Sequence, residues 1–272
     1  MLSEKIGEIT DISLKEHYIC YFDILGYKDY MDKNPDKHTQ FLVDVMMADA
    51  DVQSVLRYDG KENVGYRIYS DNFLLYIEKE LMPASEALAL MSQIARKIQA
   101  RFLMEHKIVV RGGITLGEFF ADDRIVFGQG LITAVELEGK QAIYPRIILD
   151  KKVFSDENLL KSLVNQGYIK EDIDGLYYIN YFHNKYAVEL CRGACLKLVD
   201  KYCKYHPNVT DEIKVFQATK TIDKYAWLLA KYNEACIELN LPDLEIKYDI
   251  RLNKRLLKAE IIPQKNKKEN NK

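Results

Sequence analysis

Two aspartates at the ends of apolar strands constrain the fold of this chain more than any other feature. Asp23 directly follows the apolar run 17–22, which is typical of a buried strand. Asp71 lies between two further predicted strands, 66–70 and 73–77, and therefore in a tight hairpin. A carboxylate in an apolar setting is costly unless a cation meets it. The two positions therefore predict a shared cation site, which a divalent metal carrying a triphosphate would fill.

The elements around these aspartates follow the order β-α-β-β-α-β. Apolar residues recur at helical spacing over 37–56 and 84–105, and a strand spans 108–120. This order predicts an α+β fold of the ferredoxin-like, split βαβ type, with two helices on one face of an antiparallel sheet. In that arrangement the first strand and the hairpin strand are neighbours, so Asp23 and Asp71 can share an ion.

Glycines shape the next two segments. The strand IVVRGGITLGEFF carries Arg111 and then Gly112, Gly113 and Gly117, where a missing side chain lets a backbone or a phosphate approach. The segment IVFGQGLITAVELE breaks at Gly128 into an apolar-periodic helix. A strand, a glycine and a helix in succession can point backbone N–H groups at an anion.

Composition narrows the class of protein. The chain has 272 residues and a formal net charge of -2, which does not favour a nucleic-acid partner. Its start, MLSEKIGEITD, lacks signal-peptide regions, and no window approaches about 18 apolar residues, so a cytoplasmic protein without a membrane segment is expected. Five cysteines without CxxC spacing predict buried free thiols.

The organisation changes after residue 150. We expect a core over 1–150 and then a mixed, mainly helical extension over 151–264, with long helices near 185–205 and 211–240 that pack on the core or across a dimer. Residues 265–272 form a polar, basic tail that is expected to be disordered.

Four motifs in order carry a family resemblance: FDILGY, SD in a hairpin, RGGITLGE, and FG before a helix that ends in LE. Over 1–150 the chain resembles the class III nucleotidyl cyclases, the adenylate and guanylate cyclase family. The later stretches YPRI, DGLYYINYF and KYAWLLAKYNE are most similar to the bacterial pyrimidine cyclases of Pycsar-type anti-phage systems. The resemblance implies conversion of UTP, favoured over CTP, to a 3′,5′-cyclic mononucleotide and pyrophosphate. The product, cyclic UMP, would activate a separate effector in anti-phage defence without direct contact.

The resemblance also implies site residues. Asp23 and Asp71 would be catalytic and would hold two Mn²⁺ or Mg²⁺ ions, together with the backbone carbonyl of Ile24. Structural turn aspartates are the alternative. Backbone N–H groups from Ile24 to Tyr27 would cradle the triphosphate, and the implied substrate-binding positions at this strand end are Phe22, Ile24, Gly26, Tyr27 and Lys28.

Two arginines complete the expected substrate contacts. Arg111 matches the position that meets the β- or γ-phosphate, and a surface pair with Glu118 or another acid is the alternative. Arg67 stands where purine cyclases carry their base-reading Lys or Glu, and the partner position falls on Ile125. An arginine can donate twice to the carbonyl edge of a pyrimidine, and Tyr66 or Tyr69 could shorten the pocket. A solvated strand residue is the alternative reading of Arg67.

Two positions depart from the family pattern. Where purine cyclases place an Asn and an Arg that act across the dimer, this chain has Ile132 and Glu136. Arg146, in YPRI, is the candidate catalytic replacement, and a structural Arg146 paired with Glu136 or Glu138 is the alternative.

Three other functions stay open. A catalytically inactive homologue that binds nucleotide as a sensor is favoured by Ile132 and Glu136, whereas the presence of both Asp23 and Asp71 argues for activity. A purine cyclase is the second alternative. A diguanylate-type or polymerase-palm enzyme is disfavoured because Asp71 lacks the adjacent Gly-Gly and acidic pair. The resemblance implies a homodimer with the nucleoside triphosphate site at the subunit interface.

Overall fold

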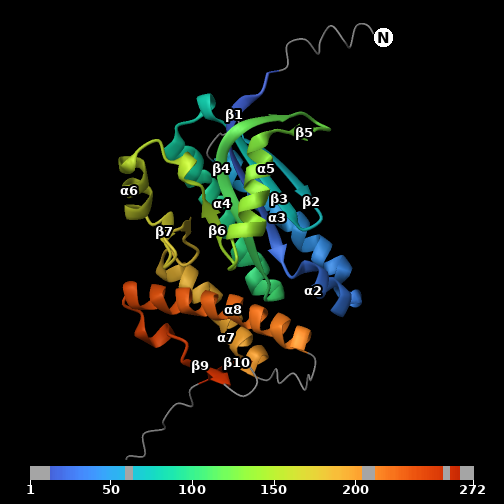
Figure 1. Ribbon diagram of the computed structural model, residues 1–272, viewed down its shortest axis with the longest axis vertical. Helices are drawn as coiled ribbons and strands as arrows, with labels where there is room; N and C mark the ends of the chain where they lie inside the picture. The colour runs from blue at the N-terminus through green and yellow to red at the C-terminus, as the bar shows by residue number, and fades with distance from the viewer. Residues whose placement is uncertain (1–12, 59–63, 204–211, 254–257, 264–272) are drawn as a thin grey trace, which may run out of the picture.

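A seven-strand path forms the centre of the molecule (Figure 1). The computed structural model describes residues 13–58, 64–203, 212–253 and 258–263. The sheet order is β2-β3-β1-β4-β6-β8-β7, and β5 pairs with β4 off this path. The strands are β1 (Lys15–Leu25), β2 (Val64–Tyr69), β3 (Asn72–Glu78), β4 (Val109–Ala121), β5 (Val126–Phe127), β6 (Ile147–Leu149), β7 (Ile169–Glu171) and β8 (Tyr177–Ile179). The α+β class is confirmed, and β1 and β3 pair side by side as the sequence predicts.

Period-two alternation along β1 assigns its side chains to the two faces of the sheet. Phe22 faces the large core, where its ring stacks on Phe73 with centroids 5.0 Å apart. The helices α3 (His38–Tyr58) and α4 (Ala84–His106) contribute to this core, through residues such as Phe41 and Phe102. Ile19 belongs to a smaller cluster on the other face. Asp23 follows Ile19 at an even spacing and therefore shares that second face.

The second face is covered by α5 (Gln129–Glu136) and the π-helical segment η4 (Leu137–Gln141). Glycines permit this close packing. A Cβ on Gly113 would lie 2.4 Å from the Cβ of Leu137, and one on Gly117 would lie 2.9 Å from the Cα of Gly130. Larger side chains at these positions would therefore push α5 and η4 away from β4, the strand that carries Arg111.

The chain beyond residue 150 adds strands as well as helices. After α6 (Glu157–Asn165), β7 and β8 extend the same sheet, and two long helices follow, α7 (Lys185–Cys203) and α8 (Glu212–Glu238). Figure 1 shows α8 crossing below the ends of β6 and α5. A hairpin of β9 (Tyr248–Asn253) and β10 (Lys258–Pro263) comes last. The remaining elements are α2 (Tyr27–Lys33), η2 (Pro35–Lys37), η3 (Lys79–Leu81), η5 (Lys151–Val153) and η6 (Pro242–Leu244).

The buried thiols and the lack of a membrane segment are two further expectations from the sequence. Cys20, Cys191, Cys195 and Cys236 are free and buried, which confirms the prediction for these four. Within the described residues, no helix combines the length and the apolar character needed to cross a membrane. The tail 265–272 lies outside the described residues.

Candidate functional site

The end of β1 and the turn between β2 and β3 bring the two predicted carboxylates together. The N–H of Ile24 donates to the carbonyl oxygen of Asp71 at 3.0 Å, and Asp23 pairs in register with Asn72. The two-residue turn places Ser70 in the left-handed region, with φ of 57°. A non-glycine residue in that conformation costs roughly 1–2 kcal/mol, so the surrounding contacts must hold the turn in place.

Asn72 orients the carboxylate of Asp71. The hydroxyl of Tyr21 donates to Oδ1 of Asn72 at 2.5 Å, and Nδ2 of Asn72 donates to Oδ1 of Asp71 at 3.2 Å. Burial raises the pKa of Tyr21 to about 12, with further contributions from Asp23 and other acids. Tyr21 therefore remains a neutral hydrogen-bond donor at physiological pH.

The ionised form of Asp23 is disfavoured in the folded chain. Burial raises the pKa of Asp23, and the nearby charge of Asp71 raises it further. Arg111 offsets part of this shift, because its Nε lies 3.3 Å from Oδ1 of Asp23. Two acids that repel each other in a partly buried setting are the arrangement that a divalent cation would stabilise.

Glu138 is a third carboxylate at this place. Its Oε1 lies 2.5 Å from Nη2 of Arg111, so Arg111 bridges Asp23 and Glu138. Glu138 is only 8% exposed, and burial, followed by the charge of Asp23, raises its pKa to about 7. From the sequence, Glu138 was expected only as an alternative partner for Arg146. The local signal at Glu138 is weaker than at Asp23, because Glu136 interrupts the apolar run that precedes it.

A lysine of α8 also acts on these carboxylates. The charge of Lys224 lowers the pKa of both Asp23 and Glu138, although burial outweighs it at each. Lys224 precedes Trp227 by three residues and Lys231 by seven, so all three lie on one face of α8. Trp227 stacks on Tyr144 of the core with centroids 5.8 Å apart, which directs this face toward the sheet. A long-range contact of this kind leaves no local pattern in the sequence.

Arg67 lies on the same face of the sheet as Asp23. It pairs with Leu74, which in turn pairs with Tyr21. Its Nη2 donates to the backbone carbonyl of Asp122 at 2.5 Å, and the N–H of Asp122 donates to the carbonyl of Ile125 at 3.0 Å. The structure therefore brings Arg67 and the Ile125 segment into one neighbourhood. Tyr66 points to the other face, where its hydroxyl donates to Asp49.

The expected phosphate cradle is altered at one position. Gly26 caps α2 with φ of 82°, and Lys28 is exposed beside it. The N–H of Ile24 is already used by Asp71, which removes it from the set of free donors. Tyr27 packs against Phe41 with centroids 5.2 Å apart. The side chain of Phe22 lies in the core on the opposite face, so only its backbone borders the site.

Arg146 lies elsewhere. Its side chain is fully buried and forms ion pairs with Asp172 and Asp174 in the segment between β7 and β8. The structure does not direct it toward Asp23 and Asp71. The alternative partner Glu136 instead pairs with Lys140 at 2.6 Å on the exposed side of α5. Arg146 joins β6 to the C-terminal part of the chain.

The carboxylates fit a metal site that the substrate completes. Among the described residues, no group of three His, Cys, Asp or Glu side chains has the geometry of a preformed metal site. Asp23 and Asp71 supply hard oxygen ligands, which suit Mg²⁺ and Mn²⁺. Mg²⁺ is usually held by one or two carboxylates plus waters and substrate phosphates, and two acids are therefore sufficient.

Three solved structures are similar to part of this chain. No protein-family model and no curated protein matches the chain. The monomeric guanylyl cyclase domain of the RhoGC fusion protein from the aquatic fungus Blastocladiella emersonii aligns with 61% of this chain and 95% of that domain, at 13% identity and a TM-score of 0.46. A bacterial light-regulated adenylyl cyclase aligns with 67% of this chain and 100% of its own, at 17% identity and a TM-score of 0.44.

Adenylate cyclases from Trypanosoma brucei in their monomeric state are a third example. The alignment covers 61% of this chain and 90% of that chain, at 14% identity and a TM-score of 0.42.

Proposed function

We propose that this protein is a metal-dependent nucleotidyl cyclase. The observation that carries the proposal is the meeting of Asp23, Asp71 and Arg111 at one end of the sheet, on the face that α5 covers. In the cyclase reaction a ribose 3′-hydroxyl attacks the α-phosphorus and pyrophosphate leaves. Catalysis of phosphoryl transfer consists mainly of positioning and charge stabilisation, and a carboxylate pair beside an arginine supplies both.

The carboxylates would hold Mg²⁺ or Mn²⁺ at Asp23 and Asp71, with the carbonyl of Ile24 as a further ligand. Two such ions, when bound, lower the charge on the attacking oxygen and on the leaving pyrophosphate. Asn72 keeps Asp71 oriented for this task through its amide. The repulsion between the two acids in the metal-free chain favours binding of a cation.

Glu138 gives Arg111 a second partner. A cation on Asp23 would compete with Arg111 for that carboxylate, and Glu138 would keep the guanidinium at the site. The Arg111 donors that Asp23 releases are then available to a phosphate oxygen. In this assignment Arg111 contacts the substrate and Glu138 is a positioning residue.

We assign to Lys224 the role of the arginine that purine cyclases carry at the position of Glu136. Its positive charge acts on Asp23 and Glu138 from α8 of the same chain, lowering the pKa of both. Arg146 is left out of the proposed mechanism because its guanidinium is buried and already paired with two aspartates.

The proposed base is a pyrimidine. Arg67 lies beside the segment 122–125, and Tyr69, which follows it by two residues, shares its face of β2 and is 49% exposed. Nη1 and Nη2 of Arg67 each donate once, to the carbonyls of Tyr66 and Asp122, which leaves one N–H of each for a base. Two such donors on a carbonyl edge, next to a bulky ring, favour uracil or cytosine over a purine. The further proposal is that UTP is converted to cyclic UMP, which acts on a separate effector in anti-phage defence.

A second copy of the chain is the proposed cover for α5 and β5. Phe127, Ile132 and Val135 are 63%, 54% and 39% exposed on these neighbouring elements. Apolar side chains grouped in this way are typical of an interaction surface. A homodimer with this face inside would place the site at the subunit interface.

The experiment is to incubate the purified protein with each of the four nucleoside triphosphates and Mn²⁺ and to resolve the products by mass. We expect a cyclic mononucleotide, most rapidly from UTP, and no product from Asp23→Asn or Asp71→Asn variants that retain the wild-type circular dichroism spectrum. Full turnover by either variant would refute the metal assignment.

A nucleotide-binding protein without catalysis is the second candidate. It is favoured by Ile132, which is exposed, and by Glu136, which pairs with Lys140 and presents no cation. Binding of a triphosphate without any product in the mass spectra would select this candidate. A cyclic purine nucleotide as the main product would instead support a purine cyclase.

A further inference from the structure

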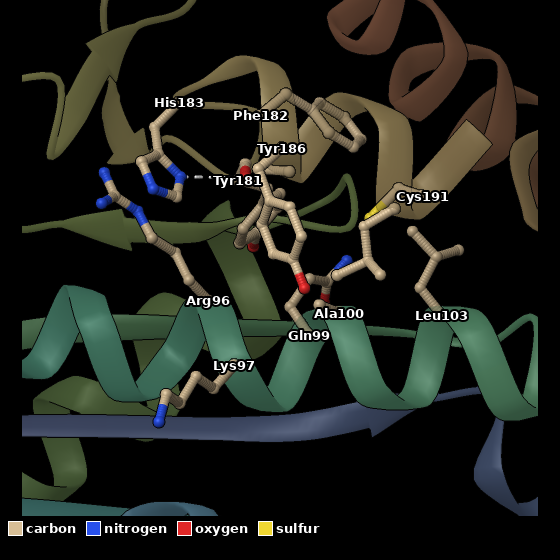
Figure 2. Close-up of a pocket in the computed structure, with 12 residues that line it drawn as sticks. Arg96, Lys97, Gln99, Ala100, Leu103, Tyr181, Phe182, His183, Tyr186 and Cys191 are labelled. Atoms are coloured by element: carbon tan, nitrogen blue, oxygen red, sulfur yellow. Dashed lines mark hydrogen bonds between the residues drawn. The ribbon is translucent and has the colours of Figure 1, made fainter. Parts of the chain in front are cut away.

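A cavity lies on the opposite side of the sheet from the carboxylates. It has a volume of about 140 Å³, is partly open to solvent, and lies between α4, the segment after β8, and α7 (Figure 2). Its apolar wall includes Leu103, Phe182 and Cys191, each at most 4% exposed. An apolar cavity of about 150 Å³ accommodates benzene. The space therefore fits a single six-membered ring.

One buried donor at this cavity has no acceptor. Gln99, which lines the cavity, is 2% exposed, and its Oε1 accepts a hydrogen bond from the N–H of Val110 at 2.7 Å. That bond fixes the orientation of the side-chain amide, so the polar atom that remains is the donor Nε2. Nε2 is buried and has no hydrogen-bond partner in the described chain. A buried donor without a partner destabilises the fold, and a ligand with an acceptor atom would satisfy it.

A positive charge without a carboxylate partner lies at the same cavity. Arg96 donates through Nε to the carbonyl of Asn180 at 2.8 Å and through Nη2 to the carbonyl of Gly167. Its guanidinium lies 5.2 Å from the ring centroid of Tyr168. No ion pair joins Arg96 to an acid anywhere in the described residues, and Nη1 remains available.

The charge of Arg96 is poorly compensated. Burial lowers the pKa of Arg96 to about 10. Burial and then the charge of Arg96 lower the pKa of His183, whose ring lies beside the guanidinium in Figure 2. Lys97 also lines the cavity, and its Nζ donates to Ser54 of α3 at 3.2 Å. An anion at the Arg96 end would supply the missing counter-charge.

We propose that this cavity binds a small aromatic carboxylate, with its ring among the apolar residues, its carboxylate on Arg96, and an acceptor group toward Nε2 of Gln99. The site does not depend on the proposed cyclase activity. Through Gln99 and Val110 it contacts the strand that carries Arg111, at the residue directly before it. A bound molecule would therefore touch the element that positions the phosphate-binding arginine.

The test measures binding of benzoate to the full-length protein by calorimetry and ligand-observed NMR, without nucleotide or metal. We expect a Kd of about 1 mM or tighter, and weaker binding of the neutral analogue benzyl alcohol by about tenfold. Ala187→Phe, which fills the cavity without removing a polar group, should abolish binding. The control Ala50→Phe places the same ring on the exposed side of α3 and should bind as the wild type does.

A second pair of variants tests the charge. Arg96→Met should weaken benzoate binding about tenfold or more, whereas Arg101→Met should leave it unchanged, because Arg101 lies outside the cavity lining and pairs with Asp51 of α3. Thermal unfolding shows whether Arg96→Met remains folded, and the Ala187→Phe result decides the question if it does not. No binding at about 10 mM benzoate, equal binding by Ala187→Phe, or equal affinity for benzyl alcohol would overturn the proposal.

Discussion

Replacing Asp172 by asparagine should weaken the junction between the sheet and α8 more than any nearby surface change. The Asp172 carboxylate, whose side chain is 1% exposed, pairs with Arg146 and with Nζ of Lys231 at 3.1 Å, and accepts from Nε1 of Trp227 at 2.8 Å. Asparagine keeps the shape and removes the charge. Arg146 would keep Asp174 and Lys231 would keep Glu234, but both would lose the buried carboxylate that they share. Breaking a buried pair costs about 3–5 kcal/mol.

The neighbouring acid gives a matched control. Asp174 also pairs with Arg146, but its side chain is 42% exposed, so Asp174→Asn should cost about 1 kcal/mol or less. Urea unfolding followed by circular dichroism measures both changes. For a chain of this size, the loss at Asp172 corresponds to a fall in Tm of roughly 6–20 °C. Equal losses from the two variants, or a loss below about 1 kcal/mol from Asp172→Asn, would refute the reasoning.

The same junction predicts a pH dependence. Burial raises the pKa of Asp172, but hydrogen bonds from the N–H of Ile173, from Lys231 and from Trp227 outweigh it, so the pKa lies below its usual value. The ionised form is therefore favoured by folding. This contribution is fully present above the unfolded pKa of about 3.9 and is lost as the pH falls through the lower folded value. In Asp172→Asn the acid-induced loss of stability should be correspondingly smaller.

Three further changes have expected outcomes. Gly113→Ala should destabilise the fold by about 1–3 kcal/mol in urea unfolding, because its Cβ would lie 2.4 Å from that of Leu137, whereas Gly139→Ala meets no atom within 4 Å and should not. Lys107→Gly should stabilise by roughly 1 kcal/mol in the same assay, because Lys107 ends α4 with φ of 58°; a loss of stability would contradict this. Since the pKa of Asp23 is raised, Asp23→Asn without metal should not lower the Tm at pH 8, and a large fall would show that the ionised Asp23 stabilises the fold.

Much of the fold could be predicted from local patterns. Helical spacing of apolar residues identified α3 and α4, and strand-length apolar runs identified β1 and β3 with an aspartate beside each. The extension of the sheet by β7 and β8 was not predicted, because three-residue strands carry too little alternation to be recognised. Pairing across the sheet is a non-local property, and short strands acquire their identity from their neighbours.

The residues of the candidate site also differ in whether the sequence alone could place them. The sequence by itself determined that Asp23 and Asp71 meet, because the order of elements makes β1 and β3 neighbours. Only the tertiary structure decided that Glu138 shares Arg111 with Asp23, that Lys224 approaches from α8, and that Asp172 and Asp174 hold Arg146 away. Period and capping are properties of adjacent residues, whereas the partner of a buried charge depends on which distant segments pack against it.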